Sequence, residues 1–265
     1  ILTGFARGNP QTGVNNPLYG LDNWIYMADM MGKTSRVQFT ARRDTTYTYS
    51  RQNVRMRPDS YQFDVLSGRS QFGHSFDTWG NHFLTHESNH IYEEVMPAKY
   101  LRRNPNLIGA GAVETVSDHG SSAKVYPITP DPNNELGKAG GITSSAGITI
   151  YQGDLFPDEY YGVSFIAESI YNLLHTDRLT KNGAAHTASR IADSTEFLAS
   201  TDRWFRPVNH YVGPDGALYV VDMCRQIIEH PDVLADEIVE NADLDNGKDC
   251  GRIYRITPEN TGNPS

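Results

Sequence analysis

The chain has 265 residues, of which 38% are hydrophobic and 21% charged, so it can bury a core and is not a disordered chain. Its formal net charge of -9 argues against a nucleic-acid binder, because phosphates need a cationic surface; it suits cation binding or a basic partner. No run of about 18 apolar residues occurs, so the sequence predicts no membrane span.

One phrase recurs along the chain, a tight turn followed by a short strand rich in apolar and aromatic residues. Its four copies are 20–29, 77–85, 162–168 and 213–222. A second phrase reads as the strand that completes each sheet, at 124–129, 172–177 and 251–256. Stacked four-stranded blades require this combination. The sequence therefore predicts an all-β fold, a β-propeller of four-stranded blades, with about four blades in residues 1–257 and a tail or linker at 258–265.

Helices should be few. The segments 97–103 and 223–230 have the apolar spacing of short helices, and the second should end before Pro231. Residues 102–122 and 130–145 are rich in Asn, Gly, Ser and Pro, so they are expected to be loops.

The two cysteines, Cys224 and Cys250, flank the last expected blade. They either form a disulfide or remain as two free buried thiols, and their positions near the end strands of one unit favour the disulfide. A disulfide would suit an oxidising, extracytoplasmic compartment, either periplasmic or secreted.

Several phrases, taken in order, resemble a known family. They are 20–26, 71–81, 100–105, 151–157, 196–207, 213–221, 228–231 and 251–256. Together they resemble the PQQ-dependent quinoprotein glucose/sorbosone dehydrogenases, most closely the planctomycete and verrucomicrobial "membrane-bound dehydrogenase" branch, over nearly the whole chain. The resemblance implies a six-bladed propeller that binds pyrroloquinoline quinone (PQQ) and calcium and oxidises a sugar or polyol. The chain lacks Cys-x-x-Cys-His, so the cytochrome c that takes the electrons would lie elsewhere.

The resemblance implies two cofactor-binding arginines. Arg69 begins a segment that matches the family's cofactor-binding phrase, except that Ser70 replaces an asparagine. Arg206 stands where the family has one of two cofactor-facing arginines. A guanidinium suits PQQ because it donates paired, charge-assisted hydrogen bonds to carboxylates. The alternative for Arg69 is an ion pair in a blade turn.

The resemblance also implies a calcium loop within 86–94. Its expected ligands are oxygen atoms, which calcium prefers, and they come from Ser88, Asn89, Glu93 and Glu94. Ser88 and Asn89 would contribute backbone carbonyls, and Glu94 or Glu93 a carboxylate. A solvated acidic loop is the alternative.

Two further patterns could bind a metal ion. A second, weaker calcium pattern places carboxylates at Asp243, Asp245 and Asp249, with an exposed acidic turn as the alternative. Histidines recur every four residues at His82, His86 and His90. On a helix this spacing could bind zinc, but the segment reads as a strand after a turn.

The base that the family uses is missing. The resemblance places a proton-abstracting histidine before Asp22, where residues 6–15 contain none, and a lysine near 169–171, where none occurs. Oxidation of a sugar carbon needs a base for the hydroxyl proton. The weak candidates are His74 and His119, and a hydrogen-bonded structural histidine is the alternative for each. Whether the protein is an enzyme therefore stays open.

Three functions remain. The first is a quinoprotein sugar or polyol dehydrogenase that passes electrons to a cytochrome. The second is a non-catalytic propeller that binds a glycan or a protein, and the third is a metal-assisted carbohydrate hydrolase or lyase. The missing base and lysine favour the second or the third.

About four repeats do not close a six-bladed ring, and the chain begins at Ile1 in strand-like sequence. A propeller needs closure to cover its edge strands. We therefore expect another chain or an N-terminal segment to complete it.

Overall fold

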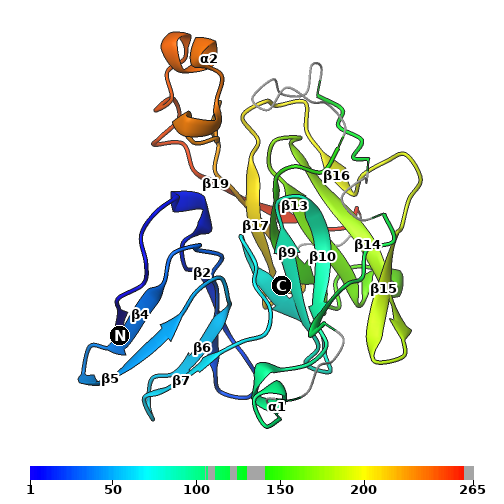
Figure 1. Ribbon diagram of the computed structural model, residues 1–265. Helices are drawn as coiled ribbons and strands as arrows, with labels where there is room; N and C mark the ends of the chain where they lie inside the picture. Colours follow the sequence, from blue (N-terminus) through cyan, green and yellow to red (C-terminus); the bar gives the residue numbers. More distant parts are fainter. Residues whose placement is uncertain (105, 107–110, 120–123, 130–140, 260–265) are drawn as a thin grey trace.

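The computed structural model describes residues 1–104, 106, 111–119, 124–129 and 141–259 (Figure 1). Over these residues the protein is built of short, antiparallel strands that form five separate sheets. None of the described helices is long and apolar enough to cross a membrane. The fold is all-β and propeller-like, as the sequence predicts.

The first two blades are antiparallel sheets of four strands each. The first blade consists of β2 (Asn15–Tyr19), β3 (Ile25–Ala28), β6 (Val54–Arg57) and β7 (Gln62–Val65). The second consists of β8 (His74–Phe76), β9 (His82–His86), β10 (Asn89–Glu94) and β11 (Val113–Thr115). In both blades the strands pair in chain order.

The third and fourth blades differ in size. The third consists of β12 (Ser145–Ile150), β13 (Val163–Glu168), β14 (Leu173–Asn182) and β15 (Ala185–Arg190), with the short β16 (Leu198–Ala199) also paired to β14. The fourth has three described strands, β17 (Pro207–Val212), β18 (Leu218–Asp222) and β19 (Arg252–Ile256).

A fifth sheet is inserted in the first blade, and the repeat in the sequence did not predict it. It consists of β1 (Leu2–Thr3), β4 (Ser35–Phe39) and β5 (Arg42–Tyr49). Val37 and Phe39 of this sheet pack against Met27 and Val54 of the first blade. The inserted sheet is thus attached to the first blade through a shared apolar layer.

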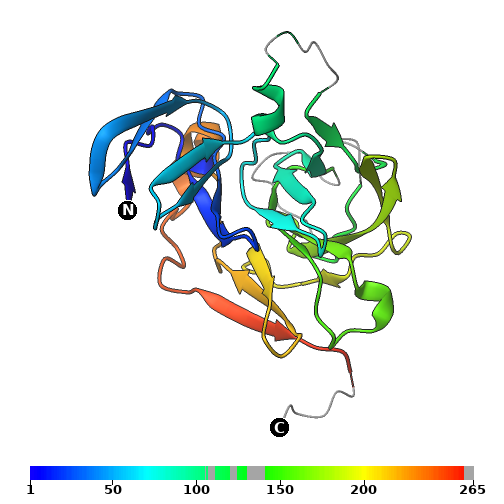
Figure 2. The same ribbon diagram turned by 90° about the horizontal axis from the view of Figure 1, so that it is seen from below.

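The strands β2, β8, β12 and β17 begin their sheets and lie side by side around a common axis, which Figure 2 views from below. Asn16 of β2 hydrogen-bonds to the side chains of Asn209 (3.0 Å) and Tyr211 (2.7 Å) on β17. The first and fourth blades therefore meet at this axis. Gly147 of β12 allows β17 to approach the third blade closely, because a Cβ there would lie 2.4 Å from Asn209 Oδ1.

Apolar side chains fill the spaces between neighbouring blades. Val163 and Phe165 of β13 share a buried cluster with Leu218 and Val220 of β18. A second cluster joins the second and third blades through residues including Phe83, Ile91, Ile148 and Ile166. This burial is what fixes each blade against the next.

All four predicted turn-strand phrases form the second strand of a blade, namely β3, β9, β13 and β18. The closing strands were predicted less well. Residues 251–256 do contain β19, but 172–177 begins β14, the third strand of its sheet. Residues 124–129 form no strand and contribute only an isolated bridge at Lys124. The loop expected at 102–122 contains β11, and 130–140 and 260–265 lie outside the described residues.

The helix predicted at 97–103 is present as α1 (Ala98–Leu101), whereas the one predicted at 223–230 was wrong. Cys224 has a φ of 52°, in the left-handed region, which interrupts a right-handed helix at its start. The chain instead forms α2 (Asp236–Asn241) beyond Pro231. Short 3₁₀ turns are η1 (Pro10–Thr12), η3 (Asp158–Tyr160) and η4 (Pro231–Val233).

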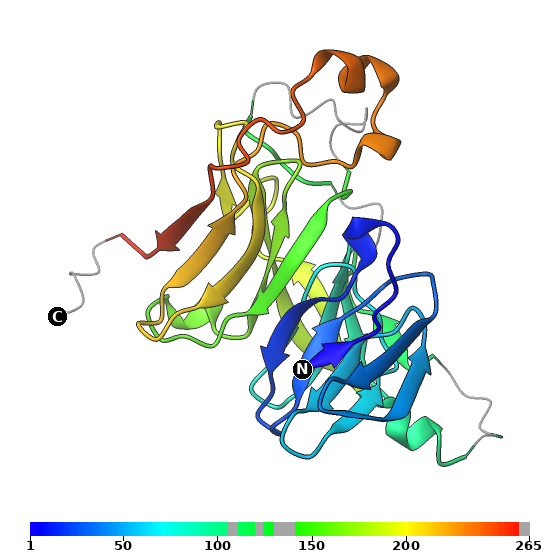
Figure 3. The ribbon, with the colours of Figure 1, turned by 90° about the vertical axis from the view of Figure 1, so that its left-hand side faces the viewer.

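The disulfide between Cys224 and Cys250 is present, with the two Cα atoms 5.5 Å apart. It closes the base of the long connection between β18 and β19, which carries α2. This connection lies at the opposite end of the molecule from α1 (Figures 1 and 3).

Candidate functional site

A cavity of about 510 Å³ lies where the four inner strands end, and we call it the axial cavity. It is lined by residues 18–22, 26, 74–77, 80, 148–150, 152 and 211–212. These residues come from the ends of β2, β8, β12 and β17 and from the turns that follow β2 and β8. A cavity at this place is formed by several blades at once, so the sequence pattern of one blade cannot reveal it.

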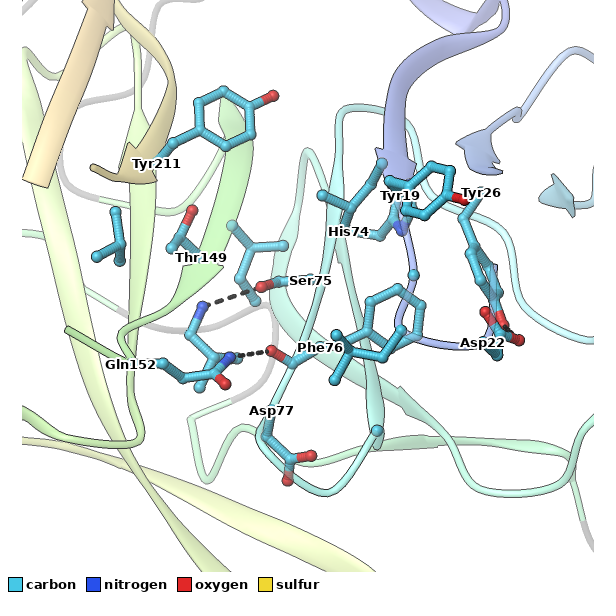
Figure 4. Close-up of a pocket in the computed structure, with 17 residues that line it drawn as sticks. Tyr19, Asp22, Tyr26, His74, Ser75, Phe76, Asp77, Thr149, Gln152 and Tyr211 are labelled. Carbon is cyan, nitrogen blue, oxygen red and sulfur yellow. Dashed lines mark hydrogen bonds between the residues drawn. The ribbon is translucent and has the colours of Figure 1, made fainter. Parts of the chain in front are cut away.

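Aromatic rings line much of the cavity. Tyr19 and Tyr211 stand on opposite sides of it, and Phe76 also lines it (Figure 4). Tyr19 and Tyr211 are 65% and 43% exposed, so their rings are accessible to a ligand. Tyr26 lies deeper, and its hydroxyl donates to Asp22 (2.8 Å). Burial of this hydroxyl raises the pKa of Tyr26 to about 12, so Tyr26 remains protonated at neutral pH.

The polar side chains of the cavity hold its wall together. Gln152 donates to the backbone oxygen of Phe76 (2.7 Å), and the Ser75 hydroxyl accepts from the backbone N–H of Ile150 (3.0 Å) (Figure 4). The accepting Ser75 hydroxyl still has its own hydrogen to donate to a ligand.

The charged residues of the cavity are acidic. Asp77 is largely occupied by its own turn, where it accepts from the backbone of Trp79 (2.9 Å) and Asn81 (2.8 Å). Asp22 accepts from the Arg55 guanidinium (3.1 Å) at the edge of the cavity. None of the described residues that line the axial cavity is a lysine or an arginine. The cavity therefore favours neutral or cationic ligands over anions.

A chain of buried hydrogen bonds runs from the cavity wall into the second blade. His74 Nε2 lies 3.0 Å from the backbone oxygen of Asn16, and His74 Nδ1 lies 3.0 Å from His82 Nε2. His82 Nδ1 is 3.0 Å from a carboxylate oxygen of Glu94. Because a carbonyl can only accept, Nε2 of His74 carries its hydrogen, and Nδ1 of His74 is left to accept from His82 Nε2. The other ring nitrogen of His82 is bonded to Glu94.

This arrangement keeps His74 neutral. Burial, with the charge of His82 as a further cause, lowers the pKa of His74 to about 3. Burial alone would raise the pKa of Glu94, but its hydrogen bond and charge interaction with His82 outweigh burial and lower it. His74 does line the cavity, as a catalytic candidate would, but both of its ring nitrogens are engaged. In this arrangement it has no free lone pair to take a proton from a ligand.

The two arginines assigned to PQQ lie outside the axial cavity. Arg206 is 2% exposed, and its guanidinium donates to the backbone oxygens of Arg225 (3.0 Å) and Ile170 (3.1 Å). Arg69 is exposed in the connection between β7 and β8, near His86. PQQ carries several carboxylates, whereas the described lining of the cavity has acidic residues and no cation. The axial cavity therefore does not fit PQQ.

The residues assigned to calcium are spread over both faces of the second blade. Glu93 and Glu94 are neighbours on β10 and therefore point to opposite faces. Glu94 is bonded to His82, and Glu93 accepts from the backbone N–H of His186 (2.8 Å). A single ion cannot be held by both carboxylates. Asn89 caps its own strand by accepting from Ile91 (3.3 Å).

The remaining assigned residues lie elsewhere. Ser88 is in the turn between β9 and β10, where its hydroxyl lies 3.3 Å from the His86 ring. The second acidic set, Asp243, Asp245 and Asp249, is exposed in the turn after α2. Asp243 accepts there from the backbone of Asp245 (3.0 Å). Calcium binding at either place stays a prediction.

His119, the other catalytic candidate, is not part of the cavity lining and lies in a group with His90, His175 and Asp177. His175 and Asp177 were not predicted as site residues from the sequence. The available signal was their alternation on β14, which places both side chains on one face of the strand. Nothing in the sequence showed that this face would be buried against another blade.

Several solved structures are similar to this chain at low identity. A glucose dehydrogenase matches over 80% of this chain and 78% of its own, with 18% identity and a TM-score of 0.36. The soluble aldose sugar dehydrogenase from Escherichia coli matches over 80% of this chain and 60% of its own, with 15% identity and a TM-score of 0.41. A streptogramin B lyase matches over 82% and 64%, with 10% identity and a TM-score of 0.35. At these scores no activity carries over to this chain.

No curated protein sequence matches the chain at a significant level. One protein family does, and it is described as a domain of unknown function, DUF7133. The match runs over residues 1–260 and so includes all four blades and the inserted sheet. This chain therefore belongs to the DUF7133 family.

Proposed function

We propose that this domain binds a neutral sugar or polyol in the axial cavity. The observation that supports the proposal is the lining, which combines accessible aromatic rings with hydroxyl, amide and carboxylate groups. Aromatic faces pack on the apolar faces of a sugar ring, and the few polar groups fix its orientation. Asp22 and Asp77 would disfavour phosphorylated or acidic sugars through charge repulsion.

Calorimetric titration with neutral sugars and polyols, alongside a sugar phosphate, tests this proposal. We expect a neutral ligand to bind and the sugar phosphate not to bind. Tyr19→Ala should weaken binding by about tenfold, which corresponds to the loss of one aromatic contact of about 1.4 kcal/mol. Tyr100→Ala removes a tyrosine that is 48% exposed on α1, outside the cavity, and should leave binding unchanged. Binding that is equal in both variants would contradict the proposed site.

We further propose, on the family resemblance, that the bound sugar is oxidised. In that case the domain would act within a quinoprotein of the "membrane-bound dehydrogenase" type, and electrons would pass to a cytochrome. Because the axial cavity does not fit PQQ, the cofactor would have to lie elsewhere, and the exposed Arg69 is the assigned residue free to reach it. The disulfide supports an extracytoplasmic location for such a protein.

Titration with PQQ, with and without calcium, separates the remaining functions. Tight binding that depends on calcium and weakens in Arg69→Ala supports the dehydrogenase. Sugar binding without PQQ binding or turnover supports a non-catalytic glycan-binding propeller. Cleavage of the sugar supports the metal-assisted hydrolase or lyase. Sedimentation analysis with and without candidate partner chains tests whether another chain completes the ring.

A further inference from the structure

Four side chains meet between the second and third blades, and we call them the interblade cluster: His90, His119, His175 and Asp177. His90 lies on β10, His119 follows β11, and the other two alternate on β14, so they share one face of that strand. One ligand atom from each lies within 4.8 Å of the others. His90, His175 and Asp177 are fully buried, whereas the His119 side chain is 17% exposed.

Each histidine of the cluster has a carboxylate at its outer nitrogen. The pairs are His90 Nε2 with Glu168 (3.1 Å), His119 Nδ1 with Asp118 (2.7 Å), and His175 Nδ1 with Glu196 (2.8 Å). A carboxylate accepts a hydrogen bond, so each pair places an imidazole hydrogen on the outer nitrogen. A neutral imidazole held in this way has its lone pair on the inner nitrogen, where a metal ion can bind. Outer carboxylates of this kind orient histidines that bind metal ions and make them more basic.

The inner nitrogens of His90 and His119 face each other. His90 Nδ1 and His119 Nε2 are only 3.3 Å apart. With both hydrogens on the outer nitrogens, two lone pairs at this distance repel each other unless a cation or a proton lies between them. His175 differs, because its inner Nε2 lies 3.0 Å from an oxygen of Asp177 and donates to it while no metal ion is bound.

One oxygen of Asp177 provides an independent sign of a missing partner. Asp177 Oδ2 is buried and has no hydrogen-bond partner among the described residues. His119 Nε2 lies 3.8 Å from this oxygen, beyond hydrogen-bond range. A buried carboxylate oxygen without a donor is costly, and a metal ion at the centre of the cluster would satisfy it.

The charges around the interblade cluster also favour a bound cation. Asp177, Glu168 and Glu196 are three buried carboxylates, and Arg190 (2.9 Å from Glu196) offsets one of them. Imidazoles that bind a metal ion are neutral, and two negative charges then remain among these groups. A buried dication would balance them, and buried charge is tolerated only when it is balanced.

We propose that the interblade cluster binds one first-row transition-metal dication, with zinc as the best match. Three imidazole nitrogens and one carboxylate oxygen form a four-ligand set typical of zinc, whereas calcium prefers six or more oxygens. All four ligands come from the protein, which is typical of a structural site rather than a catalytic one. The ion would join β10 and the segment after β11 in the second blade to β14 in the third. This proposal is independent of sugar binding in the axial cavity.

Titration of the metal-stripped full chain with Zn²⁺ and, separately, with Ca²⁺ tests the site. We expect one Zn²⁺ per chain, no comparable binding of Ca²⁺, and a higher thermal midpoint on addition of Zn²⁺. Cobalt substitution should give the visible absorption bands of a tetrahedral site. His119→Ala and Asp177→Asn should each lower Zn²⁺ affinity by at least about tenfold.

The matched control is His230→Ala, which removes a histidine outside the cluster, in the segment before η4. It should bind Zn²⁺ as the wild type does. The proposal is overturned if the wild type does not bind Zn²⁺ stoichiometrically, or if His119→Ala binds it with unchanged affinity. Should Asp177→Asn fail to fold, the partly exposed His119 still decides the outcome, because its removal opens little of the core.

Discussion

At the scale of single residues, the identities of the candidates were readable in the sequence but their environments were not. Arg206 was assigned to a cofactor, yet it is buried and donates to backbone oxygens between the third blade and the segment after β18. His74 was a candidate base, and it lines the axial cavity with both nitrogens engaged. A side chain's role depends on what surrounds it, and those neighbours come from other blades.

Buried histidines make stability depend on pH, and His210 is the simplest case. Its Nε2 donates to the backbone oxygen of Phe165 (2.7 Å), and burial lowers the pKa of His210 from 6.5 to about 4. The unfolded state therefore binds more protons than the folded state between these two values. The stabilisation that neutral His210 contributes is fully present above pH 6.5. It is lost progressively as the pH falls from 6.5 through 4, and the loss at pH 4 is about 3 kcal/mol.

Chemical denaturation of the wild type and of His210→Gln at pH 7 and pH 4 measures this effect. Gln keeps a donor for the backbone oxygen but does not titrate. The wild type should lose about 3 kcal/mol more than His210→Gln between the two pH values. Parallel losses in both proteins would show that His210 does not titrate on unfolding.

At the scale of elements, the turn-strand phrase was predictable because its determinants are local. In the turn before β18, Asp215 accepts from the backbone of Ala217 (3.2 Å), and Gly216 has a φ of 75° that glycine adopts without strain. The outer strands lack such a signal, and 124–129 was mistaken for one. The inserted strands β4 and β5 carry no copy of the phrase, so the repeat could not reveal them.

The connection between β18 and β19 depends on its disulfide. The bond closes a loop with a sequence separation of 26, which should reduce the entropy of the unfolded chain and stabilise the fold by about 3 kcal/mol. Replacing both cysteines, Cys224→Ser with Cys250→Ser, should lower the free energy of unfolding in denaturant by that amount. Met223→Ser, at an exposed neighbour, is the control and should change stability little. Equal stability of the double variant and the wild type would show that the connection holds without the bond.

At the scale of the whole molecule, the blades are held by apolar layers between them and by polar contacts at the axis. The layer between the third and fourth blades includes Phe165, which is fully buried and packs edge-to-face on Phe197 with ring centres 4.8 Å apart. Asn16 and Asn209 join the first and fourth blades. Contacts of this kind join segments far apart in the chain, so the sequence alone offers no local trace of them.

Removal of a ring from this layer should destabilise the protein strongly. Phe165→Ala leaves a cavity between the third and fourth blades and should cost about 3–5 kcal/mol in the free energy of unfolding. Ile253→Ala, at a side chain that is 70% exposed on β19, should cost little. A comparable loss in the two variants, measured by denaturant titration, would mean that the interblade layer is not the main source of stability.

The sequence by itself determined the all-β class and the second strand of each described blade, because turn chemistry and strand composition act between residues close in the chain. It favoured the disulfide over free thiols without deciding between them. The tertiary structure decided the axial cavity, the closed environment of His74 and the interblade cluster. His90, His119 and His175 lie on separate segments, and Asp177 has its oxygen aimed at them only because β10 and β14 pack against each other. The sites of this protein lie between blades, and the packing of apolar faces is what brings their residues together.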